Sequence, residues 1–296
     1  MIGPAASKIL NLPSQNCADR DCSLSRSFWR RFRGRHGGFE LNGKWYCAAQ
    51  CFQHATESRV SQLLNARPGP TRVLHRIPLG LLLLSRGQLN NTQLRSALAR
   101  QQIQNATPLG ALLTQMGYTD EQQVTAALAA QWACPTLSGG MRPDAACEGL
   151  LPARIIEHFR VLPVRFTERT RTFCVAFSEG INYPLLYTID SLLDCRTEAC
   201  VISRREMDCY LRTRKYDAGR DVFFDHQKKA SEIAHILVGY ALKSGAEKVR
   251  VAGCERYIWA RLEQRGEVAN VLFQCGDRPS PELSAPGSLP DRQAVG

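Results

Sequence analysis

The sequence predicts a multidomain protein of the α+β or α/β class, and three observations indicate it. Residues 78–101 and 108–131 repeat one apolar pattern at an offset of thirty positions, which is typical of paired helical units. Short β-branched runs alternate with amphipathic stretches after residue 150, and four N-terminal cysteines have metal-ligand spacing. The expected units are a small zinc finger and helix over 1–66, a four-helix repeat over 67–137, a small α/β domain over 138–215, a short αβββ unit over 216–275 and a disordered tail over 276–296.

The composition favours an acidic partner. The 296 residues carry a formal net charge of +11, which suits nucleic acid, anionic lipid or a phosphate ligand, or simply marks a soluble basic protein. No apolar run reaches transmembrane length, and residues 1–10 lack the pattern of a secretory signal. We therefore expect a cytoplasmic protein whose twelve cysteines are thiols or metal ligands rather than disulfides.

Four cysteines near the N-terminus form a candidate zinc site. One pair is separated by four residues and the other by three, and Zn²⁺ prefers four soft ligands presented as two close pairs. An Asn-Gly turn at residues 42–43 predicts a hairpin that delivers the second pair to the start of a helix. The arrangement resembles a treble-clef zinc finger; unpaired thiols are the alternative, with His36 and His54 as reserve ligands. The four cysteines are Cys17, Cys22, Cys47 and Cys51.

A basic loop lies between the two cysteine pairs, and aromatic residues interleave with its arginines. Such a loop can contact a phosphate backbone and stack on bases. The alternative is a solvated loop whose aromatic side chains complete a very small core. The basic residues are Arg30, Arg31, Arg33 and Arg35.

Residues 38–45 imitate a phosphate-binding loop without its chemistry. The pattern G-x-x-x-x-G-K is present, but Trp45 stands where a serine or threonine must hold Mg²⁺, and the stretch is predicted to be a hairpin. No other such loop occurs in the sequence, and no Ser/His/Asp, Cys/His or paired-carboxylate set converges. We therefore expect no ATP hydrolysis and no enzymatic activity.

Each repeat unit predicts two short helices. The first is apolar and ends at a C′ glycine, Gly87 or Gly117. The second is capped by Asn91 in one unit and by Thr119 or Asp120 in the other. A glycine near each helix start leaves N–H groups open to an anion; alternatively, the repeat is only a small core. The matched positions of the second helices are Leu94, Ala97, Leu98 and Gln101 in one unit and Val124, Ala127, Leu128 and Gln131 in the other.

This repeat resembles the N-terminal, MshEN-type domain of the ATPases that drive type II secretion and type IV pilus assembly. That family's unit begins Arg-Leu-Gly-x-x-Leu-Val-x-x-Gly and continues Leu-x-x-x-Leu-x-x-Gln, a spacing reproduced over residues 76–131. The resemblance implies a cyclic di-GMP site, because paired units bind this ligand in some members. The implied ligand residues are Leu79, Gly80, Leu83, Leu84, Gly87, Leu94, Gln101, Leu109, Gly110, Leu113, Gly117 and Gln131.

One departure from the family pattern affects the ligand prediction. The family's arginine, which stacks on guanine, is replaced by Pro78 in one unit and Pro108 in the other. Arg76 lies two residues too early to replace it. Because two cation–π contacts are lost, we expect weak binding of cyclic di-GMP or none.

The following α/β unit also resembles the family's N-terminal domain. Its matching residues are Val-Leu-Pro at 161–163, at the start of one predicted strand, and Val-Ala at 175–176, in the next. Ser203 and Glu206 predict a capping box that begins the last helix of this unit. The predicted strands span residues 161–166, 172–177 and 196–202, and the helix between the last two spans 183–193.

The C-terminal unit resembles a degenerate start of the family's motor module. Residues 216–228 are predicted to be a polar linker, and a helix and three strands follow to residue 273. Arg261 keeps one family arginine, whereas Glu263 and Arg265 replace other polar residues of the family pattern.

Two functions follow from these features. The first is a non-enzymatic regulator or adaptor that docks on secretion or pilus machinery, in the cytoplasm or at the periphery of the inner membrane, with cyclic di-GMP as a candidate ligand. The second is a zinc-finger regulator that binds nucleic acid through the basic loop.

Overall fold

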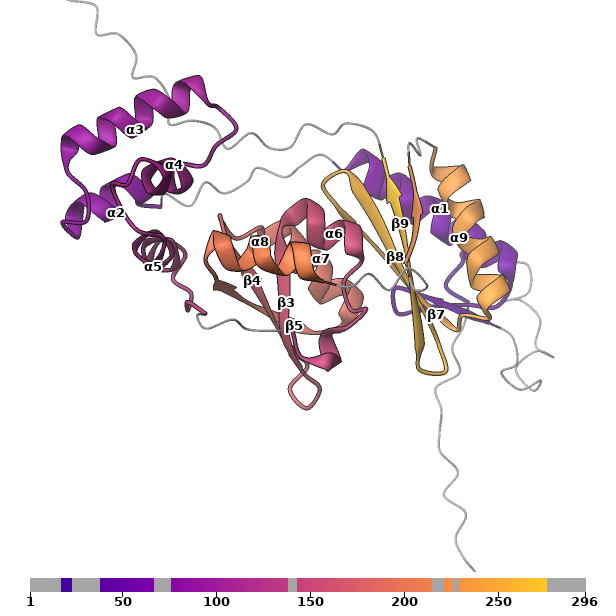
Figure 1. The fold of residues 1–296 in the computed structure, drawn as a ribbon. Coiled ribbons are helices and arrows are strands. Elements are labelled where there is room, and N and C mark those ends of the chain that lie inside the picture. The colour runs from indigo at the N-terminus through magenta and orange to yellow at the C-terminus, as the bar shows by residue number, and fades with distance from the viewer. Residues whose placement is uncertain are drawn as a thin grey trace, which may run out of the picture.

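The computed structural model describes residues 17–22, 38–66, 76–137, 143–214, 221–225 and 229–275, and Figure 1 shows their arrangement. Helices pack against two mixed β-sheets, which confirms the expected α+β class. The basic loop with Arg30, Arg31, Arg33 and Arg35 and the tail over 276–296 lie outside the described residues. Within the described part, none of the helices combines the length and apolarity that a membrane span requires.

The repeat folds as two similar pairs of short helices, at the left of Figure 1. Gly87 and Gly117 follow the first helix of each pair with φ of 66° and 68°, the left-handed conformation expected of a C′ glycine. The predicted helix ends are therefore confirmed. The helices are α2 (Leu79–Ser85), α3 (Asn91–Ile103), α4 (Leu109–Gln115) and α5 (Glu121–Trp132).

A capping box begins each second helix. The Asp120 side chain accepts a hydrogen bond from the Gln123 N–H, as one of the two expected caps should. In the first unit the cap is Asn90, whose side chain accepts from the Gln93 N–H. The expectation of Asn91 as a cap is wrong by one residue, because Asn91 already begins the helix and the side chain that reaches the N3 position belongs to its neighbour.

The two helix pairs are interlocked. α2 packs mainly on α5, and α3 packs mainly on α4. A Cβ atom added at Gly80 would lie 2.6 Å from the Leu94 side chain, and one added at Gly110 would lie 2.6 Å from Val124. Both glycines are buried, so their immediate effect is to let neighbouring helices approach closely.

The α/β unit follows with a three-stranded sheet in the order β3-β4-β5. β3 and β4 are antiparallel, and β4 and β5 are parallel with α7 as the crossover. The predicted strands, helix and Ser203 capping box are all present. The elements are a 3-10 turn (Ala145–Cys147), α6 (Ala153–Phe159), β3 (Val161–Thr167), β4 (Thr172–Phe177), α7 (Tyr183–Leu193), β5 (Arg196–Val201) and α8 (Arg204–Thr213).

The second sheet, which we call the composite sheet, joins both ends of the described chain. Its strand order is β2-β1-β7-β8-β9-β6, so the N-terminal hairpin and the C-terminal strands form one sheet. The sequence assigned these segments to separate units at 1–66 and 216–275. The elements are β1 (Phe39–Leu41), β2 (Lys44–Tyr46), α1 (Ala49–Asn65), β6 (Asp221–Phe224), α9 (Ala230–Ser244), β7 (Lys248–Cys254), β8 (Tyr257–Gln264) and β9 (Glu267–Gln274).

A hairpin turn attaches the N-terminal strands to β7. Asn42 and Gly43 have φ of 47° and 80°, as the expected Asn-Gly turn requires. The Asn42 side chain donates to the Val251 carbonyl at 3.0 Å and accepts from the Val251 N–H at 2.7 Å. The stretch that imitates a phosphate-binding loop is thus a hairpin whose turn residue is bonded to a neighbouring strand.

The strand β6 corrects the expected polar linker. Its residues pair in parallel with β9, and the Phe224 ring stacks on Phe273 with a centroid distance of 5.1 Å. The expectation of a linker over 216–228 is therefore wrong for these four residues. Such a short strand has no pattern of its own in the sequence, because the pairing and stacking that stabilise it come from β9.

The composite sheet is covered on both faces. α1 and α9 pack together on one face, over a core that includes Phe52, Leu237 and Phe273. α7 packs on the other face, in a core that includes Ile189 and Trp259. Because this second core is shared, the α/β unit and the composite sheet form one packed body.

Candidate functional site

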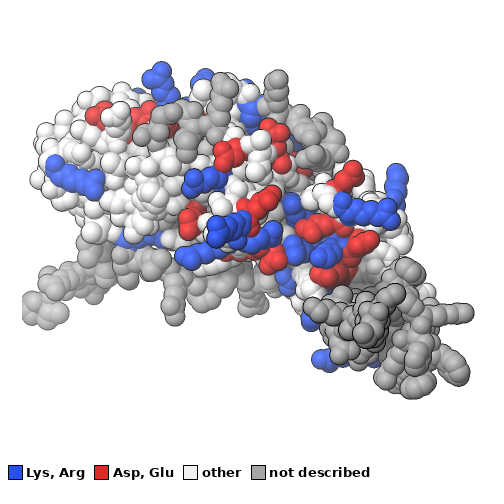
Figure 2. All heavy atoms as spheres, turned by 90° about the horizontal axis from the view of Figure 1, so that it is seen from below, with Lys and Arg blue, Asp and Glu red and all other residues white. Residues whose placement is uncertain are grey.

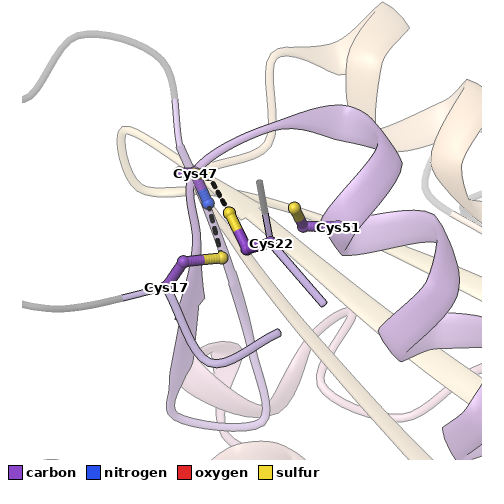
Figure 3. A group of neighbouring side chains, drawn as sticks. All are labelled: Cys17, Cys22, Cys47 and Cys51. Atoms are coloured by element: carbon purple, nitrogen blue, oxygen red, sulfur yellow. Dashed lines mark hydrogen bonds between the residues drawn. The ribbon is translucent and has the colours of Figure 1, made fainter. Parts of the chain in front are cut away.

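Four cysteines converge at the open end of the N-terminal hairpin (Figure 3). Cys17 and Cys22 come from the preceding segment, Cys47 follows β2, and Cys51 lies in the first turns of α1. Their four Sγ atoms all lie within 4.8 Å of one another. The predicted set of ligands is therefore brought together in space.

Local backbone contacts position these sulfur atoms. The Ala18 N–H donates to the Trp45 carbonyl at 2.9 Å, which fixes the first segment against β2. The Cys47 N–H donates to the Cys17 Sγ at 3.5 Å, and the Cys22 and Cys47 sulfur atoms are 3.4 Å apart. Cys22 and Cys51 are buried in the core that α1 shares with α9, so the cluster is part of the composite sheet's domain.

The donor set fits a structural Zn²⁺. Four thiolates at about 2.3 Å from a tetrahedral zinc lie about 3.8 Å apart, close to the observed spacing. Burial raises the pKa of the Cys47 thiol to about 11, with further contributions from Cys22 and Cys17, and burial also raises the pKa of Cys51. Thiols in this environment ionise at neutral pH when a cation compensates their charge.

The reserve histidine ligands do not join this cluster in the described part of the chain. The His54 side chain is 72% exposed and lies 4.0 Å from the Asp19 carboxylate. His36 lies outside the described residues. The four cysteines are therefore the ligand set that the geometry favours.

A pocket of about 480 Å³ lies between the second repeat unit and the α/β unit, and we call it the repeat pocket. Its volume is in the range of small-molecule sites. α4 and α5 form one wall, with the apolar side chains of Leu109, Val124 and Leu128. α8 and the residues that follow β4, Ser178 and Glu179, form the other wall.

The implied cyclic di-GMP residues divide into two groups in the structure. Leu83 and Leu113 are fully buried between the helices, and Gly87 and Gly117 end helices. Those that line the repeat pocket are Leu79, Leu109, Gly110 and Gln131. Those that do not line it are Gly80, Leu83, Leu84, Gly87, Leu94, Gln101, Leu113 and Gly117.

The two repeat glutamines make equivalent bonds across the units. The Gln101 Nε2 donates to the Thr107 carbonyl at 3.2 Å, directly before the proline of the second unit. The Gln131 Nε2 donates to the Ile77 carbonyl at 2.8 Å, directly before the proline of the first. Each glutamine therefore joins the last helix of one unit to the entry of the other.

Arg76 is held by aromatic side chains. Its guanidinium carbon lies 3.4 Å from the centroid of the Trp132 ring and 5.5 Å from that of Tyr183. The interaction joins the segment before α2 to the end of α5 and the start of α7. Arg76, which by its position in the sequence is a poor replacement for the family's arginine, is thus stacked on an aromatic ring of the protein itself.

The charged wall of the repeat pocket was not predicted from the sequence. The capping box at Ser203 predicted α8, but the arginines on that helix resemble a solvated surface until the repeat packs opposite them. The face of the molecule drawn in Figure 2 carries basic and acidic side chains side by side toward the middle and right, and no broad basic region is seen on it. The charged residues lining the pocket are Glu121, Glu179, Arg204, Arg205, Asp208 and Arg212.

Comparison with known proteins identifies similar folds. No family model and no curated protein sequence matches the chain. A structure of MshE with cyclic di-GMP is 24% identical, with a TM-score of 0.40, over 46% of this chain and 98% of that chain. The N-terminal domain of XpsE is 20% identical, with a TM-score of 0.35, over 45% and 91%; a second crystal form is 23% identical, with a TM-score of 0.27, over 50% and 97%. Each match spans nearly the whole of the other chain and about half of this one.

Proposed function

We propose that this chain is a non-enzymatic regulator or adaptor that docks on type II secretion or type IV pilus machinery and carries a degenerate cyclic di-GMP site. The proposed docking on this machinery is based on the resemblance of the sequence motifs. The ligand site rests on one observation: residues of the second repeat unit, with Leu79 of the first, line a single pocket with the arginines of α8. Flat guanine rings need apolar walls, and phosphates need cations or N–H donors, and both kinds of group are present.

The site is proposed to be weak. Pro78 and Pro108 precede α2 and α4 as N-cap residues, where the family pattern has its stacking arginine. Arg76 is stacked on Trp132 and does not supply the missing contact. Two lost cation–π contacts of roughly 1–2 kcal/mol each reduce the affinity by about a hundred- to thousandfold.

Calorimetric titration with cyclic di-GMP tests this proposal. We expect weak heat or none with the unmodified protein, and tighter binding by the double variant Pro78→Arg with Pro108→Arg. In that background, Leu128→Trp should block binding by filling the repeat pocket. Its matched control is Leu98→Trp, at the equivalent position of the first unit, which does not line the pocket.

Two results would contradict the ligand assignment. If the double variant binds no ligand, the repeat is a docking scaffold without a nucleotide site. If Leu98→Trp and Leu128→Trp weaken binding equally, the ligand does not occupy the repeat pocket.

The cysteine cluster is proposed to hold one structural Zn²⁺ that orders the N-terminal hairpin and α1. The support is the convergence of four Sγ atoms and the absence of other His, Cys, Asp or Glu ligands from the cluster among the described residues. This proposal is independent of the ligand site.

A further inference from the structure

The first residue of α5 contacts the beginning of α8 across the repeat pocket. The Arg205 N–H, at the second position of α8, donates to the Glu121 Oε1 at 2.6 Å. The N-terminal capping box of α8 is complete without this bond, since Ser203 and Glu206 satisfy each other's backbone N–H groups. A carboxylate of the repeat therefore supplies an additional acceptor at the positive end of an α/β-unit helix.

The surroundings of this carboxylate are those of an anion site. Ser178 lines the pocket, is only 6% exposed, and its hydroxyl has no hydrogen-bond partner. The Arg204 guanidinium lies 3.4 Å from the Glu179 carboxylate. Arg205 and Arg212 also line the pocket. On the α/β side, the arginines are Arg204, Arg205 and Arg212 in the wall and Arg160 adjacent to it, against the carboxylates of Glu179, Asp208 and the capping Glu206.

The charges around the pocket differ with and without Glu121. With Glu121 in place, the positive charge of this wall and the helix terminus is partly neutralised from the repeat side. Without it, four arginines and a helix N-terminus are balanced by three carboxylates, and the remaining positive charge suits a phosphate group. Glu121 also comes from a different unit, so it can leave without unfolding α8.

We propose that Glu121 is an internal anion that occupies the phosphate-binding end of the repeat pocket, and that a phosphate group of the ligand displaces it. This inference rests on the proposed ligand site and adds its regulation. Because Glu121 moves with α5, its displacement breaks a contact between the repeat and the α/β unit. Ligand binding is thereby coupled to the relative position of the two units.

The test compares Glu121→Gln with Glu157→Gln, a matched charge change on an exposed position of α6. An anion at a helix N-terminus contributes about 0.3–1 kcal/mol, so removing the competing charge should tighten anion binding roughly two- to fivefold. Cyclic di-GMP and inorganic pyrophosphate are titrated separately, and the backbone amide resonance of Arg205 reports the contact directly. We expect this resonance to shift on ligand addition, and Glu121→Gln alone to bind more tightly.

The outcomes separate this inference from the proposed function. If cyclic di-GMP binds the unmodified protein and Glu121→Gln equally and leaves the Arg205 amide unchanged, the displacement is wrong while the ligand assignment stands. If only pyrophosphate binds, more tightly to Glu121→Gln and with the Arg205 shift, the internal anion is supported and cyclic di-GMP is not the ligand. If neither probe binds any variant, the displacement is overturned.

Discussion

The helical repeat and the composite sheet are built in opposite ways. The repeat, α2 to α5, is closed by contacts within about fifty residues, and its two units use the same glycines, caps and glutamines. The composite sheet joins β1 at residues 39–41 to β7 at residues 248–254, so its closing contacts link residues far apart in the sequence. The repeat consists of one local helical unit that occurs twice, whereas the composite sheet forms only when segments from both ends of the described chain pair.

This difference indicates where stability is vulnerable. A repeat unit can form from neighbouring residues, because loop closure over a short segment costs little. The hairpin of β1 and β2 is too short to be stable alone and needs its neighbours in the sheet. The cysteine cluster and the Asn42 turn hold it together with the pairing of β1 to β7, so changes there should affect the sheet and spare the repeat.

Loss of the metal should have the largest effect. Cys47→Ser is expected to abolish binding of about one Zn²⁺ per chain and to unfold the hairpin and α1, because structural zinc contributes about 10–16 kcal/mol in zinc-finger peptides. Elemental analysis and hydrogen exchange over β1, α1 and β7 measure this effect. Protection in α2 to α5 should remain.

The control for the metal is Cys209→Ser, since Cys209 is exposed and lies outside the cluster. Stoichiometric zinc in the Cys47→Ser protein would rule out the ligand set. Loss of protection throughout the repeat would show that the two regions are not separable.

Equivalent core substitutions should have the next largest effect. Leu83→Ala and Leu113→Ala each remove a fully buried side chain from matched positions of the two units. Each should cost about 2–5 kcal/mol in the free energy of unfolding, measured by urea denaturation. Similar losses would support equivalent units; a loss confined to one would show that the second unit depends on the α/β wall that covers it.

Asn42→Ala should have the smallest effect of the three. It removes both bonds to Val251 and leaves that residue's backbone groups without these partners, which should cost about 1–3 kcal/mol. Asn42→Asp keeps the acceptor and loses the donor. Its free energy of unfolding should therefore lie between that of the unmodified protein and that of Asn42→Ala. Unchanged stability in Asn42→Ala would mean that the hairpin is held by the metal and strand pairing alone.

Much of the site could be predicted because its signals are local. Cysteine spacing and the Asn-Gly turn are visible within residues 17–51, and the structure brings the four sulfur atoms together. Gly87, Gly117 and Asp120 likewise act within one or two helical turns of their position. The expected cap at Asn91 failed by one residue because two adjacent asparagines offer the same side chain, and only the backbone decides which one lies outside the helix.

The repeat pocket could not be predicted, because its walls come from segments that have no common pattern. Leu98 and Leu128 occupy equivalent positions, yet Leu98 is 42% exposed and Leu128 is 8% exposed beneath the α/β unit. Nothing in either segment distinguishes them. The difference arises when α5 packs against β5, where Leu128 and Val201 share a buried cluster.

By itself, the sequence determined the local features of this protein: the helical pairs, the strands of the α/β unit, the hairpin and the spacing of the four clustered cysteines. These depend on side-chain period, glycine conformation and ligand spacing, all of which act over a few residues. The tertiary structure alone decided that the two ends share one sheet, that β6 is a strand and that one repeat unit forms a pocket. Those outcomes depend on which distant surfaces bury each other, because pairing partners and burial are properties of the assembled core and not of any one segment.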